Sequence, residues 1–272
     1  MPYERPFAAV VTGLPLEYES MRSLLTGLRR EQLSETLSTE LGDLPDSPWQ
    51  VALAKVSSHR DAAILDFVVR QLRPDALLFV GIAGSLRDDV VVGDLVVATR
   101  TYAFQGGKQT PEGFYARPQS WHPSHRMEQV ARSALRGEFR VHFRAVAAGD
   151  ITLNDEHSSL LNQLKRHYND AVAIEMESAG IAHAAHLTAG VDTLTIRGIS
   201  DVADAARMPK DHQRAQARAA ARAAQAAAVV LRALKPPPPR PTHVAYGGDH
   251  VDFHGSTFFG PAVGKIVPRG DG

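Results

Sequence analysis

Stretches rich in apolar residues alternate with amphipathic segments along most of the chain. Stretches that suit strands buried on both faces of a sheet lie at 7–14, 49–56, 76–84, 90–99, 139–149, 172–174 and 192–200. Segments with helical periodicity lie between them, at 15–28, 59–72, 158–168, 178–187 and 213–234. This alternation predicts a three-layer α/β/α sandwich around a central mixed, largely parallel sheet.

Acidic residues gather in one strand–helix–strand unit, residues 172–204. The first strand of this unit ends at Glu175 and Glu177, and the second strand ends at Asp201. A length of roughly 30 residues fits a right-handed parallel crossover, and ligands of open α/β sheets bind outside the carboxyl ends of the strands. We therefore expect these carboxylates at one rim of the sheet, a layout suited to acid–base chemistry on a small molecule.

Another acidic residue, Glu17, lies where the first strand meets the first helix. It follows Pro15, a residue typical of the first turn of a helix. Glu17 either complements the positive end of the helix dipole or joins the same rim, if the first strand runs parallel to the others. The local pattern leaves both interpretations open.

Two segments show no clear helix or strand pattern. Residues 29–48 are polar and contain prolines, which predicts a surface connection. Residues 100–123 contain several aromatic side chains among glycines and prolines. Long irregular loops are usually functional or disordered, and aromatic residues argue against disorder. The second segment therefore predicts either a pocket wall or a subunit contact.

The end of the chain differs in composition from the rest. Four prolines, 236–239, end the last helix and begin an extended linker. The residues after them are too few for a hydrophobic core of their own. We expect a main domain at 1–235 and, at 236–272, a Pro-rich linker with a short tail that forms a small hairpin or docks a protein partner.

Composition excludes several classes of function. The 30 basic and 30 acidic residues balance, so no general attraction to nucleic acid or to an anionic membrane is implied. The absence of cysteine excludes disulfides and thiolate chemistry. Residues 1–14 suggest a first strand rather than a signal peptide, and no apolar run approaches the ~18–20 residues that cross a bilayer. We expect a cytoplasmic protein without a membrane or nucleic-acid partner.

A metal site is not expected either. His183 and His186 are three residues apart on a predicted helix, but no carboxylate or third ligand obviously converges on them. The arginines at 214, 218 and 222 share one helix face, which favours a solvated surface because no aromatic residues are interleaved with them.

Five segments carry a resemblance to a known family. They are VTGLPLEYESM at 11–21, VGIAGSLRDDVVVGDLVVA at 80–98, AAGD at 147–150, AIEMESAGIAHAAH at 173–186 and TIRGISDVAD at 195–204. Over nearly all of residues 7–234 the chain resembles the purine nucleoside phosphorylase and uridine phosphorylase superfamily, and within it the 5′-methylthioadenosine/S-adenosylhomocysteine nucleosidases. The resemblance implies a nucleoside phosphorylase-like fold and cleavage of the bond between a ribose and a nucleobase.

The resemblance also implies roles for individual residues. Asp201 would act as the general acid that protonates N7 of the leaving purine, which needs a raised pKa that a partly buried rim can supply. Ser200 would orient Asp201 through a hydrogen bond, and Glu17 would activate water. In the EME segment, Met176 would lie against the ribose and Glu177 would accept hydrogen bonds from its hydroxyls. The other substrate-binding positions are Glu175, Arg197, Ala83, Gly84, Thr152 and Leu153.

Two departures from the family pattern bear on the chemistry. Phosphorylases of the superfamily hold phosphate with an arginine or serine at positions where this chain has 13–17 and 79–82, and neither segment contains one. Because a buried phosphate needs charged partners, water is the expected nucleophile. The nucleosidases place a base-stacking aromatic where this chain has Thr152 and Leu153, so a purine nucleoside or nucleotide other than methylthioadenosine is possible.

The 5′ group of the substrate is open on these grounds. Arg207, Lys210 and His212 either meet a 5′-phosphate or are plain surface charge.

The sequence therefore predicts a purine nucleosidase, with adenine as the expected base and no cofactor. Two alternatives stay open: a phosphorolytic nucleoside phosphorylase, and a nucleotide-sensing or adaptor module that binds without turnover. The resemblance further implies a homo-oligomer, with a dimer favoured, in which a neighbour completes part of the pocket.

Overall fold

The computed structural model describes residues 5–33, 38–56, 67, 69–111, 113–149, 159–176, 178–187, 191–202 and 209–237. These residues all belong to the first of two units of the chain, Met1–Pro238. Most of the predicted linker and tail, residues 236–272, lies outside the described residues. The domain boundary and the role of the tail therefore stay predictions.

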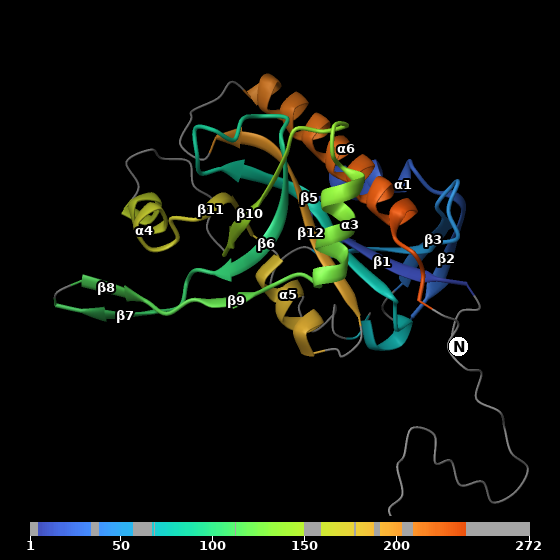
Figure 1. Cartoon of the computed structure of the whole chain (residues 1–272), viewed down its shortest axis with the longest axis horizontal. Coiled ribbons are helices and arrows are strands. Elements are labelled where there is room, and N and C mark those ends of the chain that lie inside the picture. The colour runs from blue at the N-terminus through green and yellow to red at the C-terminus, as the bar shows by residue number, and fades with distance from the viewer. Residues whose placement is uncertain are drawn as a thin grey trace, which may run out of the picture. The chain divides into compact units, whose positions relative to one another are not determined.

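A ten-stranded mixed sheet forms the centre of this unit (Figure 1). The strand order is β11-β10-β6-β12-β5-β1-β4-β3-β2, and β9 pairs with β6. The strands are β1 (Phe7–Thr12), β2 (Thr26–Gln32), β3 (Ser38–Asp43), β4 (Gln50–Lys55), β5 (Ala76–Ser85), β6 (Leu95–Ala103), β9 (Gln119–Trp121), β10 (Val141–Ala148), β11 (Ala171–Glu175) and β12 (Asp192–Val202). A separate hairpin consists of β7 (Gly107–Thr110) and β8 (Gly113–Ala116). The α/β prediction with a mixed sheet is confirmed.

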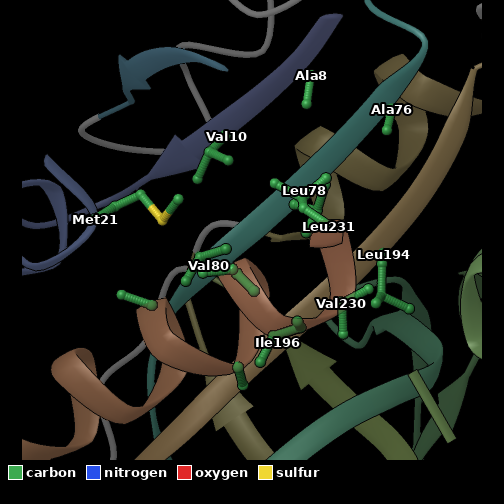
Figure 2. Packing of buried hydrophobic residues seen from close by; sticks show 14 of the residues in the cluster. Ala8, Val10, Met21, Ala76, Leu78, Val80, Leu194, Ile196, Val230 and Leu231 are labelled. Carbon is green, nitrogen blue, oxygen red and sulfur yellow. The ribbon is translucent and has the colours of Figure 1, made fainter. Parts of the chain in front are cut away.

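Helices cover both faces of the sheet. They are α1 (Pro15–Arg22), α3 (His125–Ala134), α4 (Ser159–His167), α5 (Ser178–Leu187) and α6 (Pro209–Ala233). Helices α1, α3 and α6 pack on one face, where the largest core cluster lies. Figure 2 shows Val230 and Leu231 of α6 against Leu78 and Ile196 of the sheet. The small residues of α6 and β12 let the helix and the strand approach closely. A Cβ on Gly198 of β12 would lie only 2.1 Å from the backbone of α6, so a larger residue would not fit there.

One half of the sheet closes on itself. Strand β11 pairs with β10 and also, antiparallel, with β5, so that β5, β12, β6, β10 and β11 form a ring. Small and β-branched side chains fill its interior, namely Ala83, Val90, Val96, Ala98, Val146, Val172, Ala173 and Ile199. Because β11 is parallel to β10 and β6 while β6 is antiparallel to β12, β11 and β12 run in opposite directions. The predicted parallel crossover is therefore wrong, since the curled sheet makes β11 end against β5.

Two local predictions are also corrected. The helix predicted at 15–28 ends at Arg22, and β2 and β3 form an antiparallel edge within residues predicted to be a surface connection. Gly27 has a φ of +60°, which a helix does not allow, so the apolar side chain of Leu28 reaches the core from a strand.

Residues 100–123 are not an irregular loop. Strand β6 extends to Ala103, and β7, β8 and β9 follow, because paired strands satisfy the backbone groups of this segment. Figure 1 shows the β7–β8 hairpin extending from the edge of the sheet. Tyr115 is 55% exposed there. The prediction that residues 100–123 form either a pocket wall or a subunit contact stays a prediction.

Candidate active site

The first turn of α1 holds Glu17 in a buried position against β5. Its Oε2 accepts hydrogen bonds from the backbone N–H groups of Gly13 and Leu14, each at 2.8 Å, and its Oε1 accepts one from Ile82 N–H at 2.7 Å. Glu17 is only 3% exposed. Three donors from two elements satisfy a carboxylate that would otherwise be costly to bury. Glu17 therefore does more than complement the helix dipole.

Helix α1 is itself held to the edge of the sheet by a polar cluster. The hydroxyl of Tyr18 and Nε of Arg22 donate to Oε2 of Glu40 in β3, at 2.7 and 2.8 Å. The hydrogen bonds from Arg22 and then Tyr18 lower the pKa of the Glu40 carboxyl. Burial, followed by the hydrogen bond to Glu40, raises the pKa of the Tyr18 phenol. This cluster fixes the helix that carries Glu17.

A glycine within β5, Gly81, lets two charged side chains approach each other. A Cβ on Gly81 would lie 2.1 Å from Nη1 of Arg197 and 2.5 Å from Oε1 of Glu17. Real Cβ atoms do not come so close to other atoms, so any larger residue would displace one of the two groups. The missing side chain brings a buried guanidinium and a buried carboxylate together over the backbone of β5.

Arg197 is fully buried and is held from several sides. Its Nη2 donates to Oε2 of Glu175, and its guanidinium lies 3.7 Å from the ring centroid of Phe79. The Glu175 carboxylate also accepts from Ser178, through N–H at 3.0 and 3.1 Å and through Oγ. Buried charges persist in proteins when they are paired and hydrogen-bonded in this way. The end of β11 and the start of α5 are thereby tied to β12.

Sequence reasoning did not identify Ser178 or Phe79 as part of this cluster. A signal for Ser178 was available, because the first N–H groups of a helix lack partners within it. A carboxylate three residues before Ser178 can accept from such a group, as a capping side chain does. Nothing in the sequence pattern marks Phe79, whose place depends on the pairing of β5 with β12.

Asp201 reaches the rim of the site at an irregularity in β12. The register with β5 shifts between Ile199 and Asp201, which then pairs with Gly84. Ser200 Oγ lies 2.8 Å from Oδ2 of Asp201 and 3.4 Å from the carbonyl oxygen of Ala83. A hydroxyl donates one hydrogen, and the shorter contact is to Asp201. The contact between Ser200 and Asp201 that the sequence predicted is present, and the Asp201 side chain is 25% exposed.

The structure brings most of the predicted site residues together. Ala83 and Gly84 lie in β5 beside Asp201, and Met176 is 39% exposed directly after Glu175. Glu177, Thr152, Leu153 and Arg207 lie outside the described residues. Their predicted roles in binding ribose, base or a 5′ group stay predictions.

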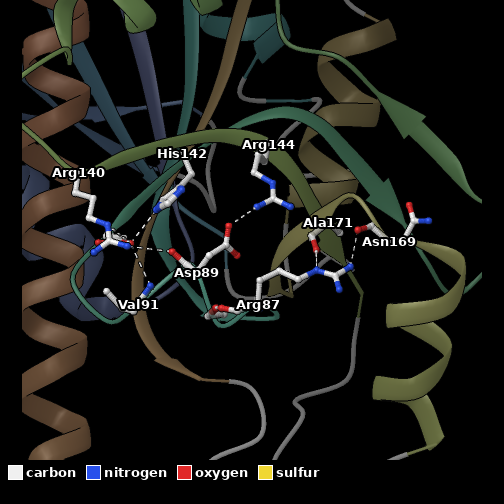
Figure 3. A network of polar contacts seen from close by, with 10 residues as sticks. Arg87, Asp89, Val91, Arg140, His142, Arg144, Asn169 and Ala171 are labelled. Carbon is white, nitrogen blue, oxygen red and sulfur yellow. Dashed lines mark hydrogen bonds and ion pairs between the residues drawn. The ribbon is translucent and has the colours of Figure 1, made fainter.

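A second polar cluster anchors the strand segment before Asp201. Oδ2 of Asp94 accepts from Nε2 of His142 at 2.8 Å and from Val91 N–H at 3.1 Å, and it pairs with Nε of Arg140 at 3.2 Å. Figure 3 shows Arg140 and His142 converging on this point, with Arg144 and Asp89 paired beside them. The Asp94 carbonyl accepts from Ile199 N–H at 2.9 Å. The cluster therefore fixes β12 two residues before Asp201.

A cavity of about 200 Å³ lies elsewhere, between α5 and the sheet. It is lined by Leu77, Phe79, Ala98, Thr101, Trp121, His122, Pro123, Ser124, Ala182, His186, Val191, Thr193, Leu194 and Thr195. It shares Phe79 with the Arg197 cluster, but none of the buried or rim carboxylates lines it. Since acid–base chemistry needs those carboxylates, the candidate active site is the region around residues 81–84 of β5 and not this cavity.

Comparisons with known proteins identify the superfamily of the chain. The family model of the phosphorylase superfamily matches residues 8–235. The chain belongs to this superfamily. The family assignment made from the sequence is thus confirmed.

Individual members of the superfamily resemble the chain over much of its length. A 5′-methylthioadenosine/S-adenosylhomocysteine nucleosidase of Chromohalobacter salexigens is 30% identical over 142 residues, 48% of this chain and 57% of that protein. The nucleosidase of the same name from Haemophilus ducreyi is 25% identical over 210 residues, 72% of this chain and 84% of that protein. The crystal structure of the Neisseria meningitidis nucleosidase, in complex with methylthio-immucillin-A, shares the fold with a TM-score of 0.71. It is 23% identical, covering 84% of this chain and 99% of that chain.

Among the described residues no group of three or more metal-ligating side chains occurs, and His183 stacks on Trp121. No described helix has the length and apolar character needed to span a bilayer.

Proposed function

We propose that the chain is a purine nucleosidase that hydrolyses the N-glycosidic bond of an adenine nucleoside or nucleotide. One observation carries the proposal: a buried, fully hydrogen-bonded carboxylate, Glu17, and an oriented rim carboxylate, Asp201, both lie against residues 82–84 of β5. Hydrolysis of this bond requires a base for water and an acid for the leaving group. The relatives named as nucleosidases support the same activity.

Asp201 acts as the acid. Ser200 donates to Oδ2 and so orients the carboxyl group that carries the proton toward the substrate. As the bond between C1′ and the base nitrogen breaks, its electron pair goes to the base, and N7 takes the proton from Asp201. A protonated leaving group lowers the negative charge that the base carries away, which is the usual gain from a general acid.

Glu17 acts on the water. Its carboxylate accepts hydrogen bonds from three N–H groups and lies beside Nη1 of Arg197. These hydrogen bonds fix the position of the carboxylate. Water adds to C1′ and gives one proton to Glu17. The ribose is held by Met176 and Glu177, and the base by the segment that contains Thr152 and Leu153.

Hydrolysis is favoured over phosphorolysis by the charges at the site. Arg197 is the cation that lies beside Glu17, and it is already paired with Glu175 and stacked on Phe79. A phosphate dianion placed between Glu17 and the ribose would face a carboxylate and share a guanidinium that is already engaged. Such an arrangement is costly for a buried anion.

The test measures base release from a panel of purine nucleosides and nucleotides, with and without inorganic phosphate. We expect phosphate-independent release of adenine by the wild type. Asp201→Asn and Glu17→Gln should each lower kcat by about 10²–10⁴-fold. Asp201→Asn should leave the thermal unfolding midpoint unchanged, whereas Glu17→Gln should also lower it, because an amide has one acceptor oxygen for the N–H groups that the carboxylate satisfies. Asp192→Asn, at the opposite end of β12 and paired with Arg126 at the surface, is the matched control and should keep full activity.

Three outcomes would contradict the proposal. Release that depends on phosphate would indicate a phosphorylase. Nucleotide binding without release of base would indicate a sensing or adaptor module. Wild-type rates in the Asp201→Asn variant would exclude the assigned acid.

Cross-linking of the purified chain would test the expected dimer. Deletion of residues 240–272 followed by activity and pull-down assays would test the docking role of the tail.

A further inference from the structure

The first turn of α6 brings a histidine to the proposed acid. Nδ1 of His212 lies 4.0 Å from Oδ2 of Asp201, and the side chains are 37% and 25% exposed. This distance is too long for a direct hydrogen bond, so the contact proposed below requires a side-chain movement or one bridging water. The sequence had left His212 open between surface charge and a contact to a 5′-phosphate.

The packing of α6 on β12 fixes this approach. The carbonyl of Ala219 occupies the space that a Cβ on Gly198 would fill. His212 precedes Ala219 by seven residues, two helical turns, so both face the strand and lie about 10 Å apart along the helix. Asp201 follows Gly198 by three residues, also about 10 Å along the strand. Because α6 runs back along β12, the contact at Gly198 sets His212 over Asp201.

An acid that gives its proton to the leaving base in every turnover must be reprotonated each time. The Asp201 side chain is a quarter exposed and accepts from Ser200, as expected of a partly buried rim, so a neighbouring side chain can reach it. Free aspartic acid is ionised at neutral pH, whereas imidazole is the side chain that exchanges a proton near neutrality.

We propose that His212 is a positioning residue that keeps a proton on the Asp201–His212 pair and directs it to the leaving base. This inference rests on the proposed function. The two groups share the proton as a unit. When Asp201 holds it, the acid passes it to N7 as the glycosidic bond breaks and the electron pair goes to the base. Proton transfer to N7 leaves Asp201 as a carboxylate and His212 neutral, with Nδ1 unprotonated. Uptake of one proton from solvent on Nδ1 then lets His212 donate to the Asp201 carboxylate, which restores the pair.

The test compares substrates that need leaving-group protonation with substrates that do not. The first is the best purine nucleoside of the panel. The second is 4-nitrophenyl β-D-ribofuranoside, whose leaving group departs as a stable anion, or an N7-methylated purine nucleoside, whose base already carries the compensating charge. The variants are His212→Phe, which keeps a ring, and His212→Asn, which keeps a donor near the place of Nδ1 but cannot hold a proton. Gln213→Ala, an exposed neighbour on α6, is the control.

We expect both His212 variants to lower kcat/KM for the purine nucleoside by about 10²-fold, as loss of proton transfer does, and to leave the proton-independent substrates within about twofold of the wild type. Gln213→Ala should change neither. Equal losses on both kinds of substrate would show a structural role or a ribose contact, and no loss on either would show no role. Wild-type behaviour of His212→Asn would show that a hydrogen bond suffices. Each of these three results overturns the inference.

Failure of the inference is distinguishable from failure of the proposed function. In the first case Asp201→Asn is still defective on the purine nucleoside while the His212 variants are not selectively impaired. In the second case the wild type itself releases no base from any member of the panel.

Discussion

Two clusters of carboxylates and arginines lie near the end of β12, and they differ in burial. In the cluster at β5 and β11, Arg197 and Glu175 have side chains that are 0% and 2% exposed. In the cluster at β6 and β10, Asp94 is buried, but its partner Arg140 is 60% exposed, and the neighbouring pair of Arg144 and Asp89 lies at the surface. Both clusters contain an arginine paired with a carboxylate.

The difference shows how to tell a reaction site from a structural brace. Burying an ion pair costs several kcal/mol per charge in desolvation, and a well-packed apolar replacement is often at least as stable. A surface pair costs little and contributes little. A fully buried arginine is therefore poorly explained by stability alone, while the partly exposed Asp94 cluster is well explained as a brace that holds β6 and β10 to β12.

The largest effect is expected from breaking the buried pair. Arg197→Met should lower the free energy of unfolding by about 3–5 kcal/mol, because it leaves the Glu175 carboxylate buried without its guanidinium. Urea unfolding followed by circular dichroism would measure the loss. Base release should fall as well, since Arg197 lies beside Glu17.

A double variant separates these two consequences. Arg197→Met combined with Glu175→Gln removes both charges, and it should recover much of the lost stability. Base release should stay low in the double variant. Recovery of activity together with stability would show that the pair is only structural, which would contradict the comparison.

A smaller effect is expected at the centre of the brace. Asp94→Asn removes the negative charge that accepts hydrogen bonds from Val91 N–H and His142 and pairs with Arg140. The substitution should lower the free energy of unfolding by about 1–3 kcal/mol. The hydrogen bonds that hold Ile199 involve the backbone N–H of Gly93 and the backbone carbonyl of Asp94. The substitution keeps these backbone groups, so kcat should fall less than in Arg197→Met. A loss of activity equal to that of Arg197→Met, at preserved stability, would mean that the brace takes part in the reaction.

The smallest effect is expected at the surface pair. Asp89→Ala removes the partner of Arg144, and both side chains are exposed. The free energy of unfolding should change by less than about 1 kcal/mol, and the change should shrink further in high salt because exposed pairs are screened. Thermal unfolding at two ionic strengths would measure it. A change in the free energy of unfolding above about 2 kcal/mol would mean that this surface pair contributes as much as the buried pair of Arg197 and Glu175, which would contradict the comparison.

Much of the site could be predicted from the residue order. Asp201 was identified as a candidate because it follows a strand, and strand ends meet at a rim of the sheet. The local pattern left Glu17 open between two interpretations, and its catalytic role, like that of Ser200, was implied by the resemblance to the family. The reasoning failed where it assumed that β11 and β12 run parallel. Their ends still meet, because β11 pairs antiparallel with the end of β5 at Ile174 and Gly84.

The rest of the site depends on contacts between segments far apart in the sequence. Gly81 has no pattern that distinguishes it from other glycines, and its role follows from Arg197 and Glu17 approaching it from two other elements. For His212, the sequence likewise allowed only two interpretations, a surface charge or a contact to a 5′-phosphate. Its place beside Asp201 follows from the packing of Ala219 on Gly198.

The amino-acid sequence by itself determined the alternation of strands and helices, the superfamily, and the acidic residues at strand ends, because these depend on local periodicity and on motifs of neighbouring residues. The tertiary structure alone decided that the sheet curls until β11 meets β5, that Arg197 and Glu17 converge over Gly81, and that His212 faces Asp201. These are outcomes of sheet closure and helix packing. Both depend on how buried surfaces fit together, and no short stretch of sequence encodes that fit.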